Sequence, residues 1–396
     1  MTKNDDKRVP VLRFKGFNDD WAQRKLGDIA NVDSSKRIHR SEYTKEGIPF
    51  FRGSEITDRK ISNLIYISKK KYNEIKNQYG VPKPGDLLIT AVGTIGNIWK
   101  VDNTSFYYKD GNLIHINPKC IDEDYLVYYF QFLKYKKIID RVASGSNQKA
   151  LTIIKVQNLK IKYPQKEGQS LIGVLLKKTE NLIALQQRKL QQLKLLKKAM
   201  LQDLFTDKNV PKLRFNGFDA NWIQCKLEKE ALLTMGQSPS GSTYSDQPST
   251  YILVQGNADL KNGWVKPRIW TTQITKLAKK GDIIITVRAP AGKVGRTNFD
   301  VVLGRGVASI QGNDFIFYLL SKMDMNKYWK KYAAGSTFES INSNDIKNTR
   351  VHVPNLPEQN RIANLFLRLD DLIRFQQNKL NNLQKTKQFL FQNMFI

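Results

Sequence analysis

The chain has 396 residues, of which 40% are hydrophobic and 10% aromatic, so it can bury two or three cores and is not a disordered polymer. Its 65 Lys and Arg residues against 36 Asp and Glu residues give a formal net charge of +29, which is typical of proteins that bind a polyanion, most often nucleic acid. The two cysteines, Cys120 and Cys225, and the lack of any apolar run of membrane-spanning length exclude a disulfide framework, a cysteine-based zinc site and a transmembrane helix.

A polar tail is expected over residues 1–8. It lacks the apolar stretch of a signal peptide, which predicts a cytoplasmic protein. A first globular domain is expected over residues 9–164. Apolar runs bounded by turn residues predict its strands, and helical spacing of apolar residues predicts a helix. The strands are expected over residues 48–51, 86–90 and 159–163, and the helix over residues 125–135.

A long helix is expected over residues 165–205, because no proline interrupts it and its apolar residues recur about every 3.6 positions. A short link over residues 206–209 leads into a second globular domain, residues 210–355. A second long helix, residues 356–396, begins with Pro357 in its first turn, where proline costs no hydrogen bond. The elements predicted in the second domain are strands over residues 251–254, 282–287 and 349–353 and a helix over residues 315–332.

The second half of the chain repeats the first. Residues 9–30 and 210–231 are identical at 12 of 22 positions, and Trp21 and Trp222 are among the shared residues. The similarity between the two halves continues with KPGDLLIT (83–90) and KKGDIIIT (279–286), and again with residues 143–164 and 333–354. A period this long indicates two homologous α/β domains, each followed by a long helix, which is an α+β fold. The aromatic residues common to both copies are expected to pack in the cores rather than to stack on bases.

The two helices carry matching apolar stripes at an offset of 190 residues. A long helix with one apolar stripe needs a partner stripe. Because the link is short, the second helix must run back along the first, so we expect an antiparallel intramolecular coiled coil with pseudo-twofold symmetry between two similar heads. The alternative is that each helix folds onto its own domain. The expected seam residues are Ile172, Leu175, Leu182, Gln186, Leu190, Leu193, Met200, Ile362, Leu365, Leu372, Gln376, Leu380, Leu383 and Leu390.

Catalytic motifs are missing from the sequence. The three histidines, His39, His115 and His352, are scattered and do not have the spacing of metal ligands. The Gly-Lys pair at residues 292–293 is followed by valine where a phosphate-binding loop needs Ser or Thr, and the Asn/Asp-Pro-Pro-Tyr tetrapeptide of adenine methyltransferases does not occur. These observations favour a binding protein that is not itself an enzyme and holds no metal.

The order of these features resembles the specificity subunit of type I restriction-modification systems. The features that carry the resemblance are the opening P-x-L-R-F-x-G-F-x-x-x-W at residues 10–21 and 211–222, the two K-x-G-D-x-x-I-T stretches, GSTFESIN (335–342) and LPEQNRI (356–362). The first copy departs from the pattern where its long helix begins, with EGQ (167–169) against PEQ (357–359).

The resemblance implies a noncatalytic subunit with two target recognition domains, each of which reads one half of a split, asymmetric site in double-stranded DNA. It implies two modification subunits and added restriction subunits as partners, and no membrane. No cofactor is implied for this chain, since S-adenosylmethionine belongs to the modification subunits and ATP with Mg²⁺ to the restriction subunits.

Polar loop residues at equivalent places in the two heads are the candidates for contact with DNA, because different chemistry at one structural place is what two different half-sites require. A loop over residues 34–40, expected to follow a helical segment, corresponds to residues 236–244 in the second head, and two strand ends and a basic cluster add further candidates. The alternative for each is a solvated loop or turn. The candidates are Ser35, Lys36, Arg37, His39, Arg40, Arg52, Ser54, Lys149, Gln237, Ser238, Ser240, Thr243, Tyr244, Gln255, Asn257, Arg288, Lys293, Arg296 and Arg305.

Two other functions remain open at this point. One is a self-contained DNA methyltransferase or endonuclease, which needs a cofactor or metal motif that the sequence does not display. The other is a basic coiled-coil protein whose heads bind RNA or a membrane surface, and competition among duplex DNA, RNA and anionic lipid at fixed salt separates it from a DNA-recognition subunit.

Overall fold

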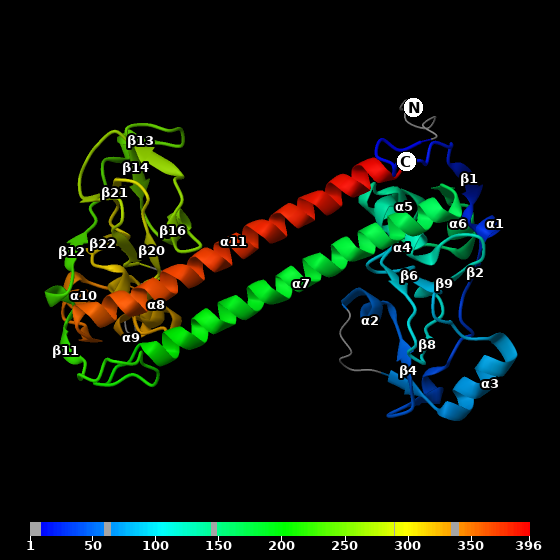
Figure 1. The fold of residues 1–396 in the computed structure, drawn as a ribbon, viewed down its shortest axis with the longest axis horizontal. Coiled ribbons are helices and arrows are strands. Elements are labelled where there is room, and N and C mark those ends of the chain that lie inside the picture. The colour runs from blue at the N-terminus through cyan, green and yellow to red at the C-terminus, as the bar shows by residue number, and fades with distance from the viewer. Residues whose placement is uncertain (1–8, 59–64, 144–148, 289, 334–339) are drawn as a thin grey trace. The chain divides into compact units, whose positions relative to one another are not determined.

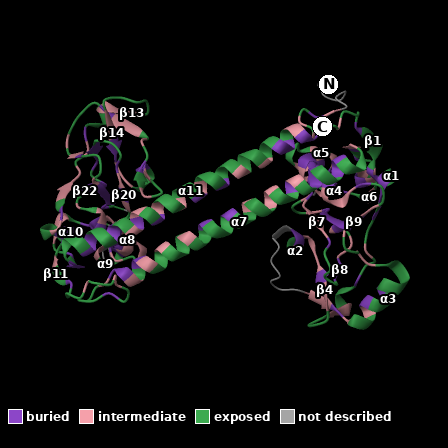
Figure 2. Cartoon of the chain, in the orientation of Figure 1, coloured by how far each residue is buried: buried purple, intermediate pink, exposed green. Residues whose placement is uncertain are grey.

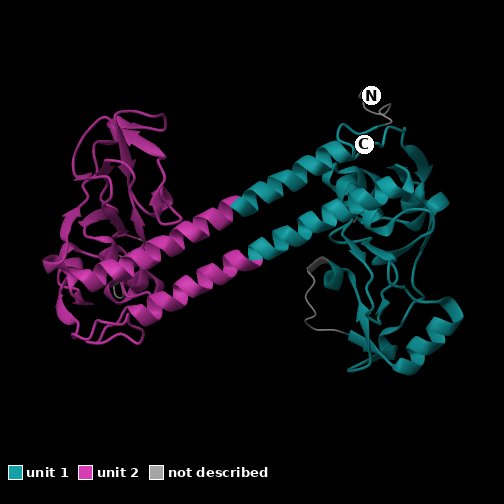
Figure 3. Cartoon of the chain, viewed as in Figure 1, with its two compact units in different colours: residues 1–187, 379–396 teal, residues 188–378 magenta. Residues whose placement is uncertain are grey.

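The computed structural model describes residues 9–58, 65–143, 149–288, 290–333 and 340–396; the predicted tail, residues 1–8, lies outside them (Figure 1). The chain divides into two compact units (Figure 3). Unit 1 comprises residues 1–187 and 379–396, and unit 2 comprises residues 188–378. Each unit therefore joins one globular part with segments of both long helices, and the predicted fold class, two mixed α/β domains each followed by a long helix, is confirmed.

Unit 1 contains two four-stranded sheets and a short strand pair. The inner sheet has the order β2-β9-β6-β7, with strands Ala30–Asp33, Leu113–Pro118, Leu87–Thr90 and Ile98–Lys100, and all its pairs are antiparallel. The outer sheet has the order β3-β5-β4-β8, with strands Tyr43–Thr44, Ile65–Ile67, Ile48–Phe51 and Tyr107–Tyr108. The strand pair consists of β1 (Ala22–Lys25) and β10 (Lys160–Tyr163).

Unit 2 repeats this plan with longer sheets. Its inner sheet has the order β12-β22-β19-β20-β16-β15, with strands Leu232–Met235, Val307–Gln311, Ile283–Thr286, Val294–Arg296, Trp264–Val265 and Leu260–Lys261. Its outer sheet has the order β13-β17-β14-β21-β18, with strands Tyr244–Ser245, Ile269–Thr271, Tyr251–Val254, Val301–Leu303 and Leu277–Ala278. The strand pair consists of β11 (Ile223–Lys226) and β23 (Arg350–Val353).

The repeated K-x-G-D motif is the turn that starts the central inner strand of each unit. Gly85 and Gly281 have φ values of 96° and 98°, which favour glycine. The aspartate that follows each glycine closes the turn. The Asp86 carboxylate accepts a hydrogen bond from the Lys83 backbone amide at 2.8 Å, and the Asp282 carboxylate accepts one from the Lys279 amide at 2.9 Å. All four residues of β6 and of β19 are buried, as expected of strands covered on both faces.

Helices pack on the sheets of both units, and the helix Lys69–Tyr79 packs with the outer sheet of unit 1. The sequence predicts the helices over residues 125–135 and 315–332 and the two long helices, but not the other short ones. In unit 1 they are α1 (Leu26–Ile29), α2 (Gly53–Asp58), α3 (Lys69–Tyr79), α4 (Glu123–Tyr135), α5 (Ile138–Val142) and α6 (Ile153–Gln157). In unit 2 they are α8 (Asp314–Met325), α9 (Lys330–Ala333) and α10 (Ser343–Lys347), and the long helices are α7 (Lys166–Leu204) and α11 (Leu356–Met394). The single helix predicted over residues 315–332 is corrected to α8 and α9, because Lys327 has a left-handed φ of 56° that ends the helical path.

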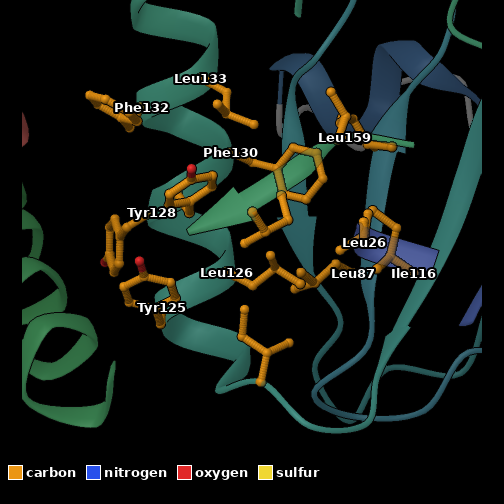
Figure 4. Packing of buried hydrophobic residues seen from close by; sticks show 14 of the residues in the cluster. Leu26, Leu87, Ile116, Tyr125, Leu126, Tyr128, Phe130, Phe132, Leu133 and Leu159 are labelled. Carbon is orange, nitrogen blue, oxygen red and sulfur yellow. The ribbon is translucent and has the colours of Figure 1, made fainter. Parts of the chain in front are cut away.

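Helix α4 supplies much of the core of unit 1 (Figure 4). Its side chains Leu126, Phe130 and Leu133 point towards the inner sheet, while Tyr125 and Tyr128 lie on its other side. On that side α4 meets the end of α11, as the next two contacts show. The Phe395 ring lies 5.7 Å from that of Tyr125 and stacks on Phe132 at 5.3 Å. The last residues of α11 therefore complete a core built mainly from the first half of the chain.

The core of unit 2 is closed in the same way by the end of α7. Phe205 contacts Phe315 and Phe366, with ring centroids 5.0 and 5.7 Å apart. Trp222 is fully buried against Phe315, and Trp21 occupies the equivalent place in unit 1, so the prediction that the repeated tryptophans are core residues is confirmed.

In each unit the two long helices run antiparallel. Within unit 1, Lys387 of α11 pairs with Glu180 of α7 at 2.5 Å, and Glu180 also accepts the Tyr128 hydroxyl. Within unit 2, Lys197 pairs with Asp370 at 2.5 Å, and Asp370 accepts the hydroxyl of Tyr318. The two networks correspond residue for residue at the offset of 190, as the duplication of the chain predicts.

The buried stripe of each long helix differs from the prediction at two positions (Figure 2). In place of the half-buried Leu175 and Leu365 it passes through Leu176 and Phe366, which are fully buried. Leu182 and Leu372 are 38% and 51% exposed, and the stripe passes instead through the half-buried Ile183 and Ile373. Steps of three and four residues both keep a side chain near one face of a helix, so the choice depends on the longer pattern. Regular alternation of four and three, a heptad repeat, selects the isoleucines. The buried or half-buried heptad positions of α7 are 172, 176, 179, 183, 186, 190, 193, 197, 200 and 204, and α11 repeats them 190 residues later.

Replacing Ile183 by glutamate is expected to lower the free energy of unfolding of unit 1 by about 2 kcal/mol, because the change places a charge in the seam. Leu182→Glu, one residue away on the exposed face, is the matched control and is expected to leave stability unchanged. Urea unfolding of both variants checks this. Equal losses of stability in the two variants would contradict the heptad assignment.

The start of each globular part is tied to the end of a long helix by one backbone hydrogen bond. In unit 2 the Leu213 amide donates to the Asp203 carbonyl at 2.9 Å. In unit 1 the Leu12 amide donates to the Asn393 carbonyl at 2.8 Å. The same junction thus occurs twice, once between residues that are close in sequence and once between residues from opposite ends of the chain.

Candidate DNA interface

The predicted DNA-contacting loop occupies the same structural place in both units. It carries the chain from the inner to the outer sheet, from β2 to β3 in unit 1 and from β12 to β13 in unit 2. The loop follows a strand in each case, and the expectation that it follows a helical segment is corrected, because the short helix α1 ends at Ile29, before β2. An inner-to-outer crossover leaves polar side chains at the boundary of two sheets.

Three contacts fix the loop of unit 1 while leaving its cations exposed. The Lys36 amide donates to the Tyr107 hydroxyl at 2.7 Å, and Arg37 Nε donates to Asp110 at 2.9 Å. The His39 amide donates to Glu42 at 2.8 Å. The Arg37 side chain is nonetheless 71% exposed. The side chains of Lys36, His39 and Arg40 are also exposed, whereas Ser35 is half-buried. The backbone is thus held and the positive charges face solvent.

An ion pair joins this loop to helix α3. Lys71 donates to Glu42 at 2.8 Å. The hydrogen bond from Lys71, helped by that from the His39 amide, lowers the pKa of Glu42 below its ordinary value. One lysine of the run at residues 69–71 is therefore occupied within the protein, and Lys69 and Lys70 are exposed.

His115 holds the start of the loop of unit 1. Its Nδ1 lies 2.9 Å from Asp33 and its Nε2 lies 2.7 Å from Asp86, so both nitrogens donate only when the ring is protonated. Burial disfavours the charge, but hydrogen bonds to the two carboxylates outweigh burial and raise the pKa of His115 to about 9. Asp33 is the last residue of β2, directly before the loop. The imidazolium therefore clamps the base of the loop to the inner sheet.

The stability of unit 1 is expected to fall as the pH rises from 6.5 past 9. The folded-state pKa of His115 is raised from 6.5 to about 9, so its contribution is complete below pH 6.5 and lost above pH 9. A shift of this size corresponds to about 3 kcal/mol. Urea unfolding across this range should show the loss in the wild type and not in His115→Gln. The same pH slope in both proteins would contradict the assignment.

The predicted strand-end candidates lie at equivalent places, where two backbone amides and the Arg52 side chain hold the turn. Arg52, at the end of β4, donates through its amide and its guanidinium to Glu55 at 2.7 and 2.6 Å. The amide of Gln255, at the end of β14, donates to the buried Asp259 at 2.7 Å, and Arg268 pairs with the same carboxylate. The neighbouring candidates Ser54 and Asn257 are exposed.

The loop of unit 2 has the same position and a different chemistry. Its backbone is fixed by the Gln237 amide, which donates to the Leu303 carbonyl at 2.9 Å, and by Ser240, whose amide donates to Gln273 at 2.7 Å. Thr243 and Tyr244 donate their hydroxyls to carbonyls within the loop, those of Ser240 and Pro239. The loop offers hydroxyl and amide groups where that of unit 1 offers cations.

The basic cluster predicted in unit 2 falls into two groups, two residues that form ion pairs within the protein and two that are exposed. Arg296 is engaged within the protein, since it pairs with Asp314 at 2.5 Å and its guanidinium lies 4.3 Å from the Phe317 ring centroid. Its side chain is 14% exposed, so the prediction of a phosphate contact there is corrected. Lys293 pairs with Asp324. Arg288 and Arg305 are exposed, and so is Lys149 of unit 1.

The structure adds one turn that sequence reasoning missed, the turn after β8 at residues 109–111. It carries Lys109, whose amide donates to the Phe51 carbonyl, and Asp110, which holds Arg37. In unit 2 the equivalent turn carries Arg305, whose amide donates to Ser238 at 3.1 Å. Alignment of FYYKDGN (106–112) with VVLGRGV (301–307) was the signal available. Each crossover loop thus lies against this turn.

No cluster of three or more potential metal-ligand side chains occurs in the described part of the chain. None of the helices within the described ranges combines the length and apolarity that crossing a bilayer requires.

Comparison with known proteins identifies a family that matches most of this chain. The family described as type I restriction modification DNA specificity domain matches residues 18–195 and 234–385. A putative type I restriction enzyme MjaX specificity subunit of Methanocaldococcus jannaschii is 29% identical over 93% of this chain and 91% of its own length. The crystal structure of a type I restriction-modification S subunit from M. genitalium covers 98% of this chain and 99% of its own, with a TM-score of 0.62 and 13% identity. A chain from a structure of type I R-M complex assembly has a TM-score of 0.57 at 20% identity and covers 95% of this chain and 97% of its own.

Proposed function

The chain belongs to the type I restriction modification DNA specificity family, as a noncatalytic subunit that recognises DNA sequence, and we propose that each of its two units reads one half of a split, asymmetric site. One observation supports the division of labour. The crossover loop has the same place in both units, but it presents Lys36, Arg37 and Arg40 in unit 1 and Gln237, Ser238 and Ser240 in unit 2. Different groups on a common scaffold suit two different half-sites.

The exposed cations of unit 1 are proposed to contact phosphates or guanine edges. Arginine is suited to both, since its guanidinium forms paired hydrogen bonds with phosphate oxygens and with guanine. In unit 2, the exposed Arg305 next to Ser238 is proposed to supply the phosphate contact that the loop itself lacks. The remaining candidates, including Ser54, Asn257, Arg288 and Lys149, lie on the exposed surface and are proposed as further contacts.

The predicted domain boundaries, with recognition domains over residues 9–164 and 210–355 and long helices over residues 165–205 and 356–396, are retained as a proposal. Two modification subunits that carry S-adenosylmethionine and restriction subunits that use ATP and Mg²⁺ are proposed as partners. Because the target is DNA and not a membrane, the proposed location is the cytoplasm.

Exchange of residues 34–150 for the corresponding segment of another specificity subunit tests the proposal. The chimera is expected to change one half-site and to keep the other, because the exchanged residues lie in unit 1. Mapping of methylated adenines in cells that also express the modification partner gives the result. The matched exchange of residues 236–340 in unit 2 should change the other half-site. If either chimera alters both half-sites, the division of labour is wrong.

A further inference from the structure

Helix α3 of unit 1 packs with the crossover loop. It follows strand β5 and lies beside the outer sheet (Figure 1). Its buried side chains Tyr72 and Ile75 belong to the same apolar cluster as Ile38 of the loop. Lys71, in its first turn, also forms an ion pair with Glu42 at 2.8 Å. The helix and the loop therefore form one continuous part of the surface of unit 1.

A line of exposed polar side chains runs from the loop along α3. Lys36 of the loop lies over the ring of Tyr79, with its Nζ 5.1 Å from the ring centroid. Tyr79, which is 55% exposed, stands three residues after Lys76. Lys76 in turn stands three residues after Asn73 and seven after Lys69, and such spacings place side chains on one face of a helix. These five exposed residues, Lys36, Lys69, Asn73, Lys76 and Tyr79, form the α3 track.

The positive charges of the α3 track are not balanced within the protein. Among the described residues, no carboxylate forms an ion pair with any of its three lysines. Glu42 is engaged with Lys71. Glu74, the one acid of α3, stands five residues after Lys69 and two before Lys76, and these spacings place it on another face of the helix. Cations in the first turn also oppose the helix dipole, so they do not serve the stability of α3.

Unit 2 uses the same place in its chain to support its crossover loop, but with different groups. Residues 272–282, between β17 and β19, correspond to the segment between β5 and β6 and contain the short strand β18 in place of a helix. The Gln273 side chain accepts the Ser240 amide at 2.7 Å. The Thr275 hydroxyl donates to the Gln237 carbonyl. In each unit the supporting segment thus shares the chemistry of its loop, neutral polar groups in unit 2 and cations in unit 1, which indicates that loop and segment meet the same partner.

DNA is the partner whose chemistry fits the α3 track. Each DNA strand carries one negative charge about every 3.4 Å along the duplex axis. The rise of α3 from Lys69 to Tyr79 is about 15 Å, so the track is long enough to follow several phosphates. Lysine ammonium groups bind phosphates without reading sequence, and amide and hydroxyl groups also donate to phosphate oxygens. Resting on the function proposed for unit 1, we propose that the α3 track binds the DNA backbone beside the half-site that the crossover loop reads.

The double variant Lys69→Gln with Lys76→Gln tests the track in the full-length chain assembled with its modification partner. Both residues are exposed, and glutamine and lysine have similar helix propensities, so α3 should be retained. Fluorescence anisotropy measures binding to two duplexes, one with the site that the complex methylates and one of scrambled sequence, from about 50 to 200 mM salt. The variant should bind both duplexes about tenfold more weakly at low salt, and the slope of log K against log salt should fall by about two. An unchanged slope would overturn the proposal.

Lys25→Gln with Lys160→Gln is the matched control. These two lysines are exposed and lie opposite each other in the strand pair β1 and β10, away from α3 within unit 1 (Figure 1). The control loses the same charge and should keep the wild-type salt slope. An equal fall in both double variants would show an effect of net charge alone, and the track would be excluded. Lys69→Arg with Lys76→Arg keeps the charge and should restore the wild-type slope, and a slope as low as that of the glutamine variant would contradict the phosphate contacts.

Two further measurements separate the α3 track from other uses of the same surface. If the glutamine double variant keeps its salt slope and instead loses affinity for the modification partner, the track binds a protein and the assignment to DNA is wrong. Mapping of methylated adenines should give the wild-type site in the double variant, because phosphate contacts carry no base preference, and a changed half-site would overturn their assignment. Failure of the division of labour between the units shows in the methylation pattern of the chimeras, and failure of the track shows in the salt slope, so the two remain distinguishable.

Discussion

Glu358→Gln is expected to lower the free energy of unfolding of unit 2 by about 3 kcal/mol. Glu358 is buried, with 1% of its side chain exposed, and it neutralises Arg214, whose side chain is 15% exposed. The hydrogen bonds from Arg214 to Glu358 raise the pKa of the arginine further, so the guanidinium stays charged when its partner is lost. The variant thus leaves a guanidinium with little water and without its hydrogen-bonded counterion, and Asp219, a minor electrostatic influence on Arg214, is the carboxylate that remains.

Asp371→Asn is the matched control on the same helix. Asp371 and Arg374 form an ion pair whose side chains are 68% and 69% exposed, and such pairs add little to stability. Urea unfolding followed by the fluorescence of Trp222 should therefore separate the two variants. If Asp371→Asn lowers the free energy of unfolding as much as Glu358→Gln does, the buried pair of Arg214 and Glu358 contributes no more to stability than an exposed pair.

Replacing Phe391 and Phe395 by alanine is expected to unfold unit 1 locally and to leave unit 2 protected. Both side chains are buried against α4, and each truncation of a buried phenylalanine costs about 3–5 kcal/mol. Together they approach the whole stability of a typical domain. Hydrogen exchange should show loss of protection in β6, β9 and α4, with β19 and β22 unchanged.

Phe389→Ala is the control for this prediction, because Phe389 lies on the same turn of α11 and is 55% exposed. It should leave exchange in unit 1 unchanged. If loss of Phe391 and Phe395 exposed unit 2 as much as unit 1, the assignment of the end of α11 to the core of unit 1 would be wrong.

Local patterns predicted the elements well where one physical rule dominates. The strands at residues 48–51 and 251–254 match β4 and β14, because apolar runs between turn residues admit few alternatives. The architecture was predicted from the duplication, because a match between the two copies does not depend on the correct assignment of any single helix or strand. The predicted seam was one residue off at Leu175 and again at Leu182, because in both places two neighbouring apolar residues fit the helical period and only the heptad repeat distinguishes them.

The candidate interface was predictable in place but not in the use of its side chains. Position in the repeat located both crossover loops. Nothing in the sequence indicates that Arg296 lies on Phe317 or that His115 bridges Asp33 and Asp86, because these partners come from strands and helices distant in the chain. Pairing of charges depends on register between elements, which composition and spacing do not determine.

The two equivalent backbone junctions, Leu213 with Asp203 and Leu12 with Asn393, bear on the order of the chain itself. In the first junction a short peptide connects the end of the long helix to the start of the globular part. In the second junction the same two kinds of segment meet, but no peptide connects them. The contacts that hold each unit together therefore do not depend on which of the two junctions is bridged by a peptide link. A circular permutant that connects the end of α11 to residue 9 through a short peptide, and is opened between residues 206 and 209, should keep both cores, with the second copy leading the chain.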